Sequence, residues 1–139
     1  MKRYAYIGCT IAYASLIFYL SSQSSPPNPK MLVSLYSTLK SFGFDFLAYP
    51  FYFAYRYPDK FCHMVLYMGF GFVLYQAIKN TMSKYQTVIS MIIGTLYSVF
   101  DEIHQLMVPQ RTASMGDLFA DVVGLTISQI FIGIGRRFL

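Results

Sequence analysis

Charged residues are scarce in this 139-residue chain, at 12%, whereas soluble domains average about 25%. Hydrophobic residues make up 55% of the chain, and the mean hydropathy is +0.44. A soluble fold of this size has too little interior to bury so much apolar surface. These values exclude a soluble globular protein and a disordered tail, and the length leaves room for one domain. An integral membrane protein remains.

Tryptophan is absent, and there are only two cysteines, Cys9 and Cys62. Two cysteines cannot build the disulfide framework of a small secreted scaffold. They lie near opposite ends of different apolar segments, so we expect both thiols to stay reduced. Without tryptophan, the 13 tyrosines and 13 phenylalanines must supply any aromatic belt at the membrane surface. The chain also lacks a G-x-S-x-G motif, a P-loop and a dinucleotide-binding fingerprint.

Four apolar segments reach or approach the length of about 20 residues that a bilayer requires. They run over residues 4–20, 61–78, 87–108 and 118–135. Basic residues flank these segments, which is typical of membrane spans and not of a nucleic-acid-binding surface. The first segment begins like a signal peptide, but no A-x-A-like cleavage site follows it, so we interpret it as a retained helix. The predicted fold class is an all-α integral membrane protein, a four-helix transmembrane bundle forming a single domain over residues 1–139.

Residues 30–57 are expected to lie at the membrane interface. Over residues 30–43 the apolar side chains share one side of a helix, and Lys30 and four hydroxyl residues share the other. This pattern predicts an amphipathic helix on the membrane surface. Residues 42–57 carry nine aromatics around Pro50, which indicates a short re-entrant or interfacial hairpin. A partly inserted fifth helix is the alternative.

The distribution of lysine and arginine predicts which ends face the cytoplasm. With the N-terminus inside, the inner side carries six basic residues: Lys2, Arg3, Lys79, Lys84, Arg136 and Arg137. The outer side carries five, mostly in a long loop where charges weigh less. We therefore predict a multi-pass protein of the cytoplasmic membrane with both termini cytoplasmic.

Ionisable residues recur near the predicted outer ends of three spans. A helix rises about 1.5 Å per residue, which places His63, Asp101 and Asp121 about 24, 26 and 22 Å from the basic inner ends of their helices. The three helices would therefore bring these side chains to one layer beneath the outer surface. Ionisable groups at such depths usually face a bundle interior or a wet cavity.

This polar layer supplies the candidate functional residues. Asp101 or Glu102 would act as a general base and His63 as a proton shuttle, because burial can separate two neighbouring carboxyls into an acid and a base. Arg111 would bind an anion with its guanidinium group. The other candidate ligand-binding residues are Asp59, Lys60, Tyr67, Gln105, Asp117 and Asp121.

Simpler roles stay open for several of these residues. Asp59 could begin a helix, Lys60 could anchor a span at the interface, and Asp117 could complete a capping box with Ser114. Zinc or manganese would accept five side chains as ligands: His63, Asp101, Glu102, His104 and Asp121. No H-x-x-x-H or C-x-x-C pair accompanies them, so we expect no metal and no other cofactor.

The polar residues also form an ordered series of motifs. They are Ser21-Ser22-Gln23, Asp59-Lys60-x-x-His63-x-x-x-Tyr67, Asp101-Glu102-x-x-Gln105-x-x-x-Pro109-x-Arg111, and Asp117. The series resembles the motifs of VanZ-like membrane proteins across essentially the whole chain. Where that family's last motif has asparagine before glycine, this sequence has Asp121 before Gly124. The resemblance implies a cytoplasmic-membrane protein associated with low-level resistance to teicoplanin and little or none to vancomycin, and it assigns no reaction.

Three functions are consistent with these observations. In the first, a polar pocket near the extracytoplasmic face binds an envelope lipid, a lipid-linked cell-wall precursor or a glycopeptide-related ligand. In the second, the same carboxylates catalyse acid–base chemistry on an outer-leaflet lipid-linked substrate. In the third, the charges only pair with one another and hold four short helices together. Membrane lipids are the expected partners, and a homo-oligomer stays open because four short helices bury limited area.

Overall fold

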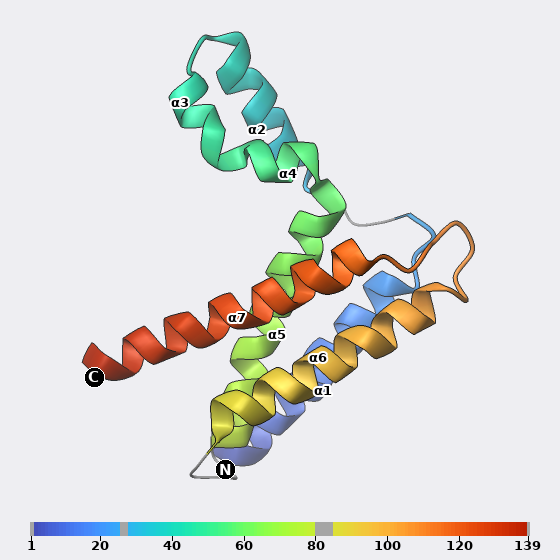
Figure 1. Cartoon of the computed structure of the whole chain (residues 1–139), viewed down its shortest axis with the longest axis vertical. Coiled ribbons are helices and arrows are strands. Elements are labelled where there is room, and N and C mark those ends of the chain that lie inside the picture. The colour runs from blue at the N-terminus through green and yellow to red at the C-terminus, as the bar shows by residue number, and fades with distance from the viewer. Residues whose placement is uncertain (1, 26–27, 80–84, 139) are drawn as a thin grey trace.

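The computed structural model describes residues 2–25, 28–79 and 85–138. Within these ranges, side chains are described from residue 4 to residue 137. The elements, in chain order, are α1 (Lys2–Ser21), α2 (Lys30–Ser41), α3 (Asp45–Ala48), the 3-10 turn η1 (Tyr49–Phe51), α4 (Tyr52–Arg56), α5 (Pro58–Lys79), α6 (Gln86–Gln105) and α7 (Met115–Phe138). No strand occurs within the described ranges (Figure 1). The predicted all-α class is therefore confirmed.

Three helices are long and apolar enough to cross a membrane. They are the segments Tyr4–Ser21, Pro58–Lys79 and Met115–Arg137, which correspond to three of the four predicted spans. The fourth, α6, is not among them, so the four-span bundle is confirmed only in part. α6 ends at Gln105 rather than at residue 108, and its buried side is polar, with the buried residues Ser90, Gly94, Ser98, Asp101, Glu102 and Gln105.

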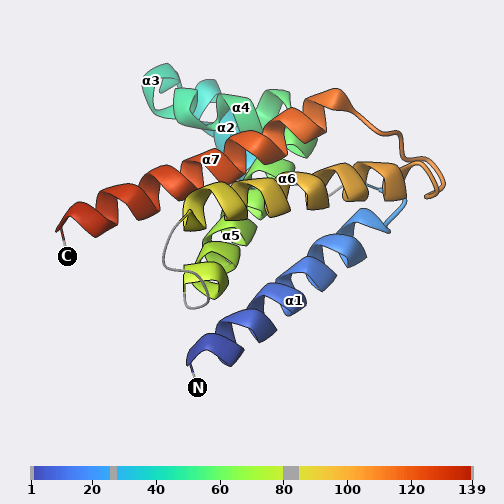
Figure 2. The ribbon, with the colours of Figure 1, turned by 60° about the horizontal axis from the view of Figure 1, so that its bottom comes forward.

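The long helices pack around α5, which contacts α1, α6 and α7. α7 also contacts α6 and crosses the other helices obliquely (Figures 1 and 2). The buried apolar cluster draws on α1, α5 and α7, and consists of Ile17, Tyr67, Phe70, Leu74, Ile78 and Leu125. This cluster occupies the middle of the bundle and leaves the polar residues to meet near one end.

Gly124 brings the backbones of α5 and α7 into close contact. A methyl group at this position would overlap the carbonyl oxygen of Met64 and lie 2.9 Å from the backbone nitrogen of Met68. Small residues at helix interfaces allow this kind of close approach in membrane proteins. The approach fixes how near the polar side chains of α5 and α7 can come to each other.

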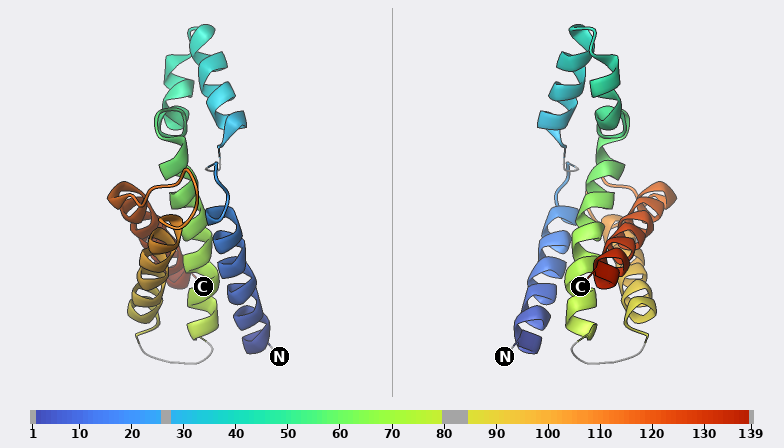
Figure 3. Two further views of the ribbon diagram at one scale, coloured as in Figure 1. Left: turned by 90° about the vertical axis from the view of Figure 1, so that its right-hand side faces the viewer. Right: turned by 90° about the vertical axis from the view of Figure 1, so that its left-hand side faces the viewer.

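Residues 30–56 form a helical hairpin that extends beyond the bundle from the start of α5 (Figures 1 and 3). Gly43, with φ of +79°, makes the turn between α2 and α3. The helix predicted over residues 30–43 is present and ends at Ser41, with its hydroxyl-bearing side exposed. On its apolar side Tyr36 is buried and stacks on Tyr55 of α4 at a centroid distance of 4.3 Å, whereas Leu35 and Phe42 are exposed. The hairpin is thus held together by its own aromatic residues.

Basic residues lie at the ends of α5 and α7 that are far from the polar residues. Lys79 ends α5, and Arg136, which donates to the hydroxyl of Tyr75 at 3.0 Å, lies in the last turn of α7 with Arg137. Lys84, also used to predict orientation, lies outside the described residues, as do the side chains of Lys2 and Arg3. Both cysteines are free thiols, as expected.

Candidate functional site

The polar residues predicted to share one layer come together where the first turns of α5 and α7 meet the last turns of α6. His63 lies on α5, Asp101 and Glu102 lie on α6, and Asp117 and Asp121 lie on α7. All five side chains are buried. Ligand atoms of His63, Glu102 and Asp121 lie within 4.8 Å of one another, as expected for side chains that share one layer.

His63 and Asp121 form the centre of this layer. The Nδ1 atom of His63 lies 2.9 Å from Oδ1 of Asp121, and the Ser98 hydroxyl donates to Oδ2 of Asp121 at 2.6 Å. A carboxylate bonded to one ring nitrogen fixes the orientation of the imidazole. Ser98 was missed by the sequence analysis, although it lies four residues before Glu102 and so faces the same way.

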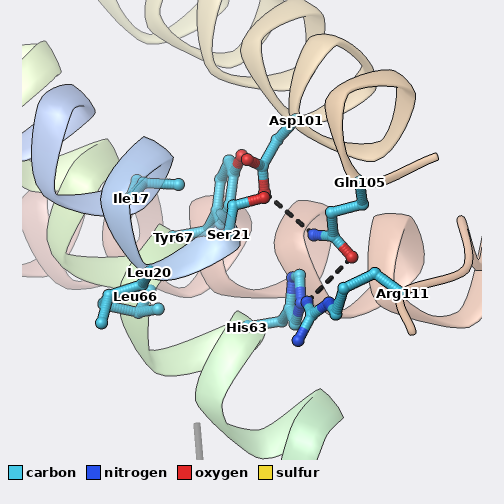
Figure 4. Close-up of a pocket in the computed structure, with 9 residues that line it drawn as sticks. All are labelled: Ile17, Leu20, Ser21, His63, Leu66, Tyr67, Asp101, Gln105 and Arg111. Atoms are coloured by element: carbon cyan, nitrogen blue, oxygen red, sulfur yellow. Dashed lines mark hydrogen bonds between the residues drawn. The ribbon is translucent and has the colours of Figure 1, made fainter. Parts of the chain in front are cut away.

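A second chain of hydrogen bonds connects Asp101 to Arg111. The Gln105 amide donates to Oδ2 of Asp101 at 3.3 Å, and Nη2 of Arg111 donates to Oε1 of Gln105 at 2.8 Å. Figure 4 shows both bonds, with Ser21 beside the Asp101 carboxylate. Arg111 therefore reaches the carboxylate through an amide and not as a direct ion pair.

The alternative of a capping box at Ser114 is wrong. Asp117 pairs with Lys60 at 2.8 Å instead of turning back to Ser114. The Ser114 backbone N–H donates to Oε2 of Glu102 at 2.7 Å, and the Ser114 hydroxyl accepts from the Gly116 N–H at 3.1 Å. A side chain of α6 thus replaces the acidic residue of the box and ties the start of α7 to α6.

Some buried polar atoms in the layer make no hydrogen bond within the described part of the chain. They are Oδ1 of Asp59, Oδ1 of Asp101, Oε1 of Glu102 and Nη1 of Arg111. Buried polar groups in proteins are nearly always partnered. These atoms are therefore available to a ligand, a proton or an ion.

Two spaces adjoin the layer. The first is a narrow cavity of about 10 Å³, room for about one water molecule. Its polar lining comprises Ser21, His63, Tyr67, Asp101, Gln105 and Arg111 (Figure 4). The second is a groove of about 210 Å³ along α6 and the start of α7, lined by Val99, Glu102, Ile103, Leu106, Ala113, Ser114, Met115 and Leu118. Glu102 belongs both to the polar layer and to the wall of this apolar groove.

The remaining predicted residues lie in the layer or at its edge. Tyr67, at 1% exposure, lines the cavity one turn from His63. Asp59 is half-buried in the first turn of α5, so its position also fits the simpler role of beginning a helix. A carboxylate oxygen of Asp59 nevertheless lies within 4.8 Å of ligand atoms of His63 and Asp117.

The family model described as VanZ/LLP1 matches residues 6–135. The chain belongs to the VanZ/LLP1 family. The resemblance inferred from the order of the motifs is thereby confirmed. No curated protein and no solved structure matches the chain. Membership of the VanZ/LLP1 family, together with three apolar helices of spanning length, indicates a membrane protein.

Proposed function

We propose that this VanZ/LLP1-family protein crosses the cytoplasmic membrane with four helices, α6 included. Twenty residues of helix span about 30 Å, the thickness of the hydrocarbon core. The polar residues of α6 face the bundle, and large apolar residues face outward: Val88, Ile92, Leu96, Val99 and Ile103 are all exposed. A helix with this distribution suits a lipid environment, where polar groups turn inward.

The proposed orientation places both termini in the cytoplasm and the polar layer near the extracytoplasmic face. Lys79, Arg136 and Arg137 lie at the opposite end of the bundle from the layer. Basic residues flanking the spans favour the cytoplasmic side. The layer and the aromatic hairpin then face the cell envelope.

The polar layer, in this proposal, binds the head of an amphipathic envelope molecule such as a lipid or a lipid-linked cell-wall precursor, and this binding underlies low-level teicoplanin resistance. The supporting observation is the position of Glu102 between the layer and the apolar groove. The groove suits a hydrocarbon chain, while Oε1 of Glu102 and Nη1 of Arg111 offer an acceptor and a donor without partners among the described residues. Ligand sites typically combine apolar walls with a few polar groups of this kind.

The bond between His63 and Asp121 supports an enzyme as the second candidate function. An imidazole held by a carboxylate can transfer a proton through its other nitrogen. In this case Asp101 or Glu102 acts as the base, His63 carries the proton and Arg111 holds an anionic substrate group. Charge pairing alone, the third function considered, does not explain why Oε1 of Glu102 is left without a partner in the described chain.

Native mass spectrometry of the purified protein with a polyprenyl pyrophosphate that carries a sugar, the class of lipid-linked cell-wall precursor, tests the binding proposal. We expect Glu102→Gln to weaken binding about tenfold or more, because the carboxylate would accept a hydrogen bond from a sugar hydroxyl, and a hydrogen bond to a charged group is worth about 1.5–3 kcal/mol. Asp45→Asn, which neutralises an exposed carboxylate of the hairpin, is the matched control and should bind like the wild type. Equal binding by Glu102→Gln would refute the pocket.

The same spectra separate the two candidate functions. An enzyme converts the bound lipid to a species of different mass, and Glu102→Gln prevents the conversion. A binding protein returns the lipid unchanged, and the variant loses only affinity.

A further inference from the structure

We propose that the polar layer holds one divalent transition-metal ion of the zinc class between His63, Glu102 and Asp121. One ligand atom from each of these residues lies within 4.8 Å of the other two, and all three residues are buried. One imidazole nitrogen and two carboxylates are a donor set that zinc accepts, whereas magnesium and calcium take shells of six or more oxygens. The sequence predicts no metal, because it contains no H-x-x-x-H or C-x-x-C pair and the ligands come from three helices; the fold of α5, α6 and α7 nevertheless brings them together.

The spacing of the His63 and Asp121 donor atoms is close to that around a tetrahedral ion, and a Glu102 oxygen lies within 4.8 Å of both residues' ligand atoms. With bonds of about 2.0–2.1 Å, two ligand atoms of tetrahedral zinc lie about 3.3 Å apart. His63 Nδ1 and Asp121 Oδ1 are 2.9 Å apart, so they need to separate by only a few tenths of an ångström. The ion would take the place of the proton that these two atoms share, and its binding would therefore release a proton.

Glu102 supplies the second observation that points to an ion. Its side chain is 7% exposed, and Oε1 has no hydrogen-bond partner among the described residues. The Ser114 N–H donates to Oε2 of Glu102. In the same way, the Ser98 hydroxyl donates to Oδ2 of Asp121. Each carboxylate is thus oriented by a hydrogen bond to one oxygen, while the other oxygen, bonded to His63 in Asp121 and unpartnered in Glu102, would bind the ion.

The charge of the layer also requires compensation. Five carboxylates gather here, those of Asp59, Asp101, Glu102, Asp117 and Asp121. Two permanent cations lie beside them: Lys60 pairs with Asp117, and Arg111 bonds to the neutral Gln105. Buried uncompensated charge costs several kcal/mol per ion. A divalent cation bound by Glu102 and Asp121 would compensate the charges of these two carboxylates.

This inference concerns the same residues as the proposed function but goes beyond it. Three protein ligands leave a fourth position on zinc, and Glu102 places that position beside the apolar groove. A metal ion would give this acidic layer the positive charge needed to attract an anionic head group.

Metal content measured by mass spectrometry tests the site directly. The protein is purified in detergent with a tag that contains no histidine, incubated with zinc and desalted. We expect about one zinc per chain in the wild type and in Asp45→Asn, and a loss of most of it in Glu102→Gln and His63→Gln. Glu102→Gln keeps an oxygen for the Ser114 N–H, so helix content by circular dichroism should not change.

Cobalt provides a second measurement, because the visible absorption of Co²⁺ reports coordination by the protein. The wild type should give tetrahedral bands that Glu102→Gln lacks. The inference is overturned if the wild type keeps less than about a tenth of an equivalent of zinc, or if both ligand variants keep as much as the wild type. A protein that binds zinc but no polyprenyl pyrophosphate refutes the proposed function alone; one that binds the lipid without zinc overturns this inference alone.

Discussion

Gly124→Ala tests whether close packing of α5 against α7 builds the polar layer. The new methyl would overlap the Met64 carbonyl oxygen and lie 2.9 Å from the Met68 nitrogen, and neither backbone atom can rotate away. Overpacking costs about 1–3 kcal/mol, whereas replacing glycine by alanine inside a helix gains about 0.5–1 kcal/mol. A clash with backbone belongs at the upper end of the first range, so we expect a net destabilisation of about 2–2.5 kcal/mol.

Gly133→Ala is the matched control, because it lies on the same helix and a methyl there meets nothing within 4 Å. The assay is the free energy of unfolding in mixed micelles as the fraction of sodium dodecyl sulfate rises, followed by circular dichroism. The control should be unchanged or more stable by up to about 1 kcal/mol. Because Gly124 lies about one turn from Asp121, its variant should also lose zinc. Equal stability of the two variants would refute the packing argument.

Two further predictions concern contacts between helices and use the same unfolding assay. Tyr97→Phe removes the hydrogen bond from the Tyr97 hydroxyl to the Ala14 carbonyl, 2.7 Å long, that connects α6 to α1; we expect a loss of about 0.5–1.5 kcal/mol, and no loss would mean that this contact does not hold α1. Lys60→Met should destabilise the wild type more than it destabilises the Asp117→Asn variant. In the wild type the substitution leaves the Asp117 carboxylate, which is 5% exposed, without its cation. Lys60 is 35% exposed, so the coupling should be about 1 kcal/mol, and a coupling of zero would count against the pair.

The sequence was sufficient to predict the long helices and the depth of the polar residues, because both depend on local properties. Apolar runs defined α1, α5 and α7, and the fixed rise of a helix placed His63 and Asp121 at the same level. Which side chains then bond to each other depends on how the helices cross, and that is decided by contacts such as Gly124 against Met64. The pairing of His63 with Asp121 could not be read from spacing.

Contacts with residues distant in sequence explain where local sequence patterns and the structure differ. Ser114 and Asp117 have the spacing of a capping box, but Lys60 takes the Asp117 carboxylate and Glu102 takes the Ser114 N–H. On α2, the helical pattern did not predict that Tyr36 packs against Tyr55 of α4. In both cases a residue distant in sequence provides a partner that a pattern within one helix cannot reveal.

Teicoplanin and vancomycin susceptibility in a sensitive Gram-positive host tests most directly whether the polar layer carries the function. The host would express the wild type, Glu102→Gln, Asp45→Asn or no protein, with membrane levels matched by immunoblot. We predict a higher inhibitory concentration of teicoplanin, and not of vancomycin, for the wild type and Asp45→Asn, and no rise for Glu102→Gln. No rise for the wild type at equal expression, or an equal rise for Glu102→Gln, would contradict the account.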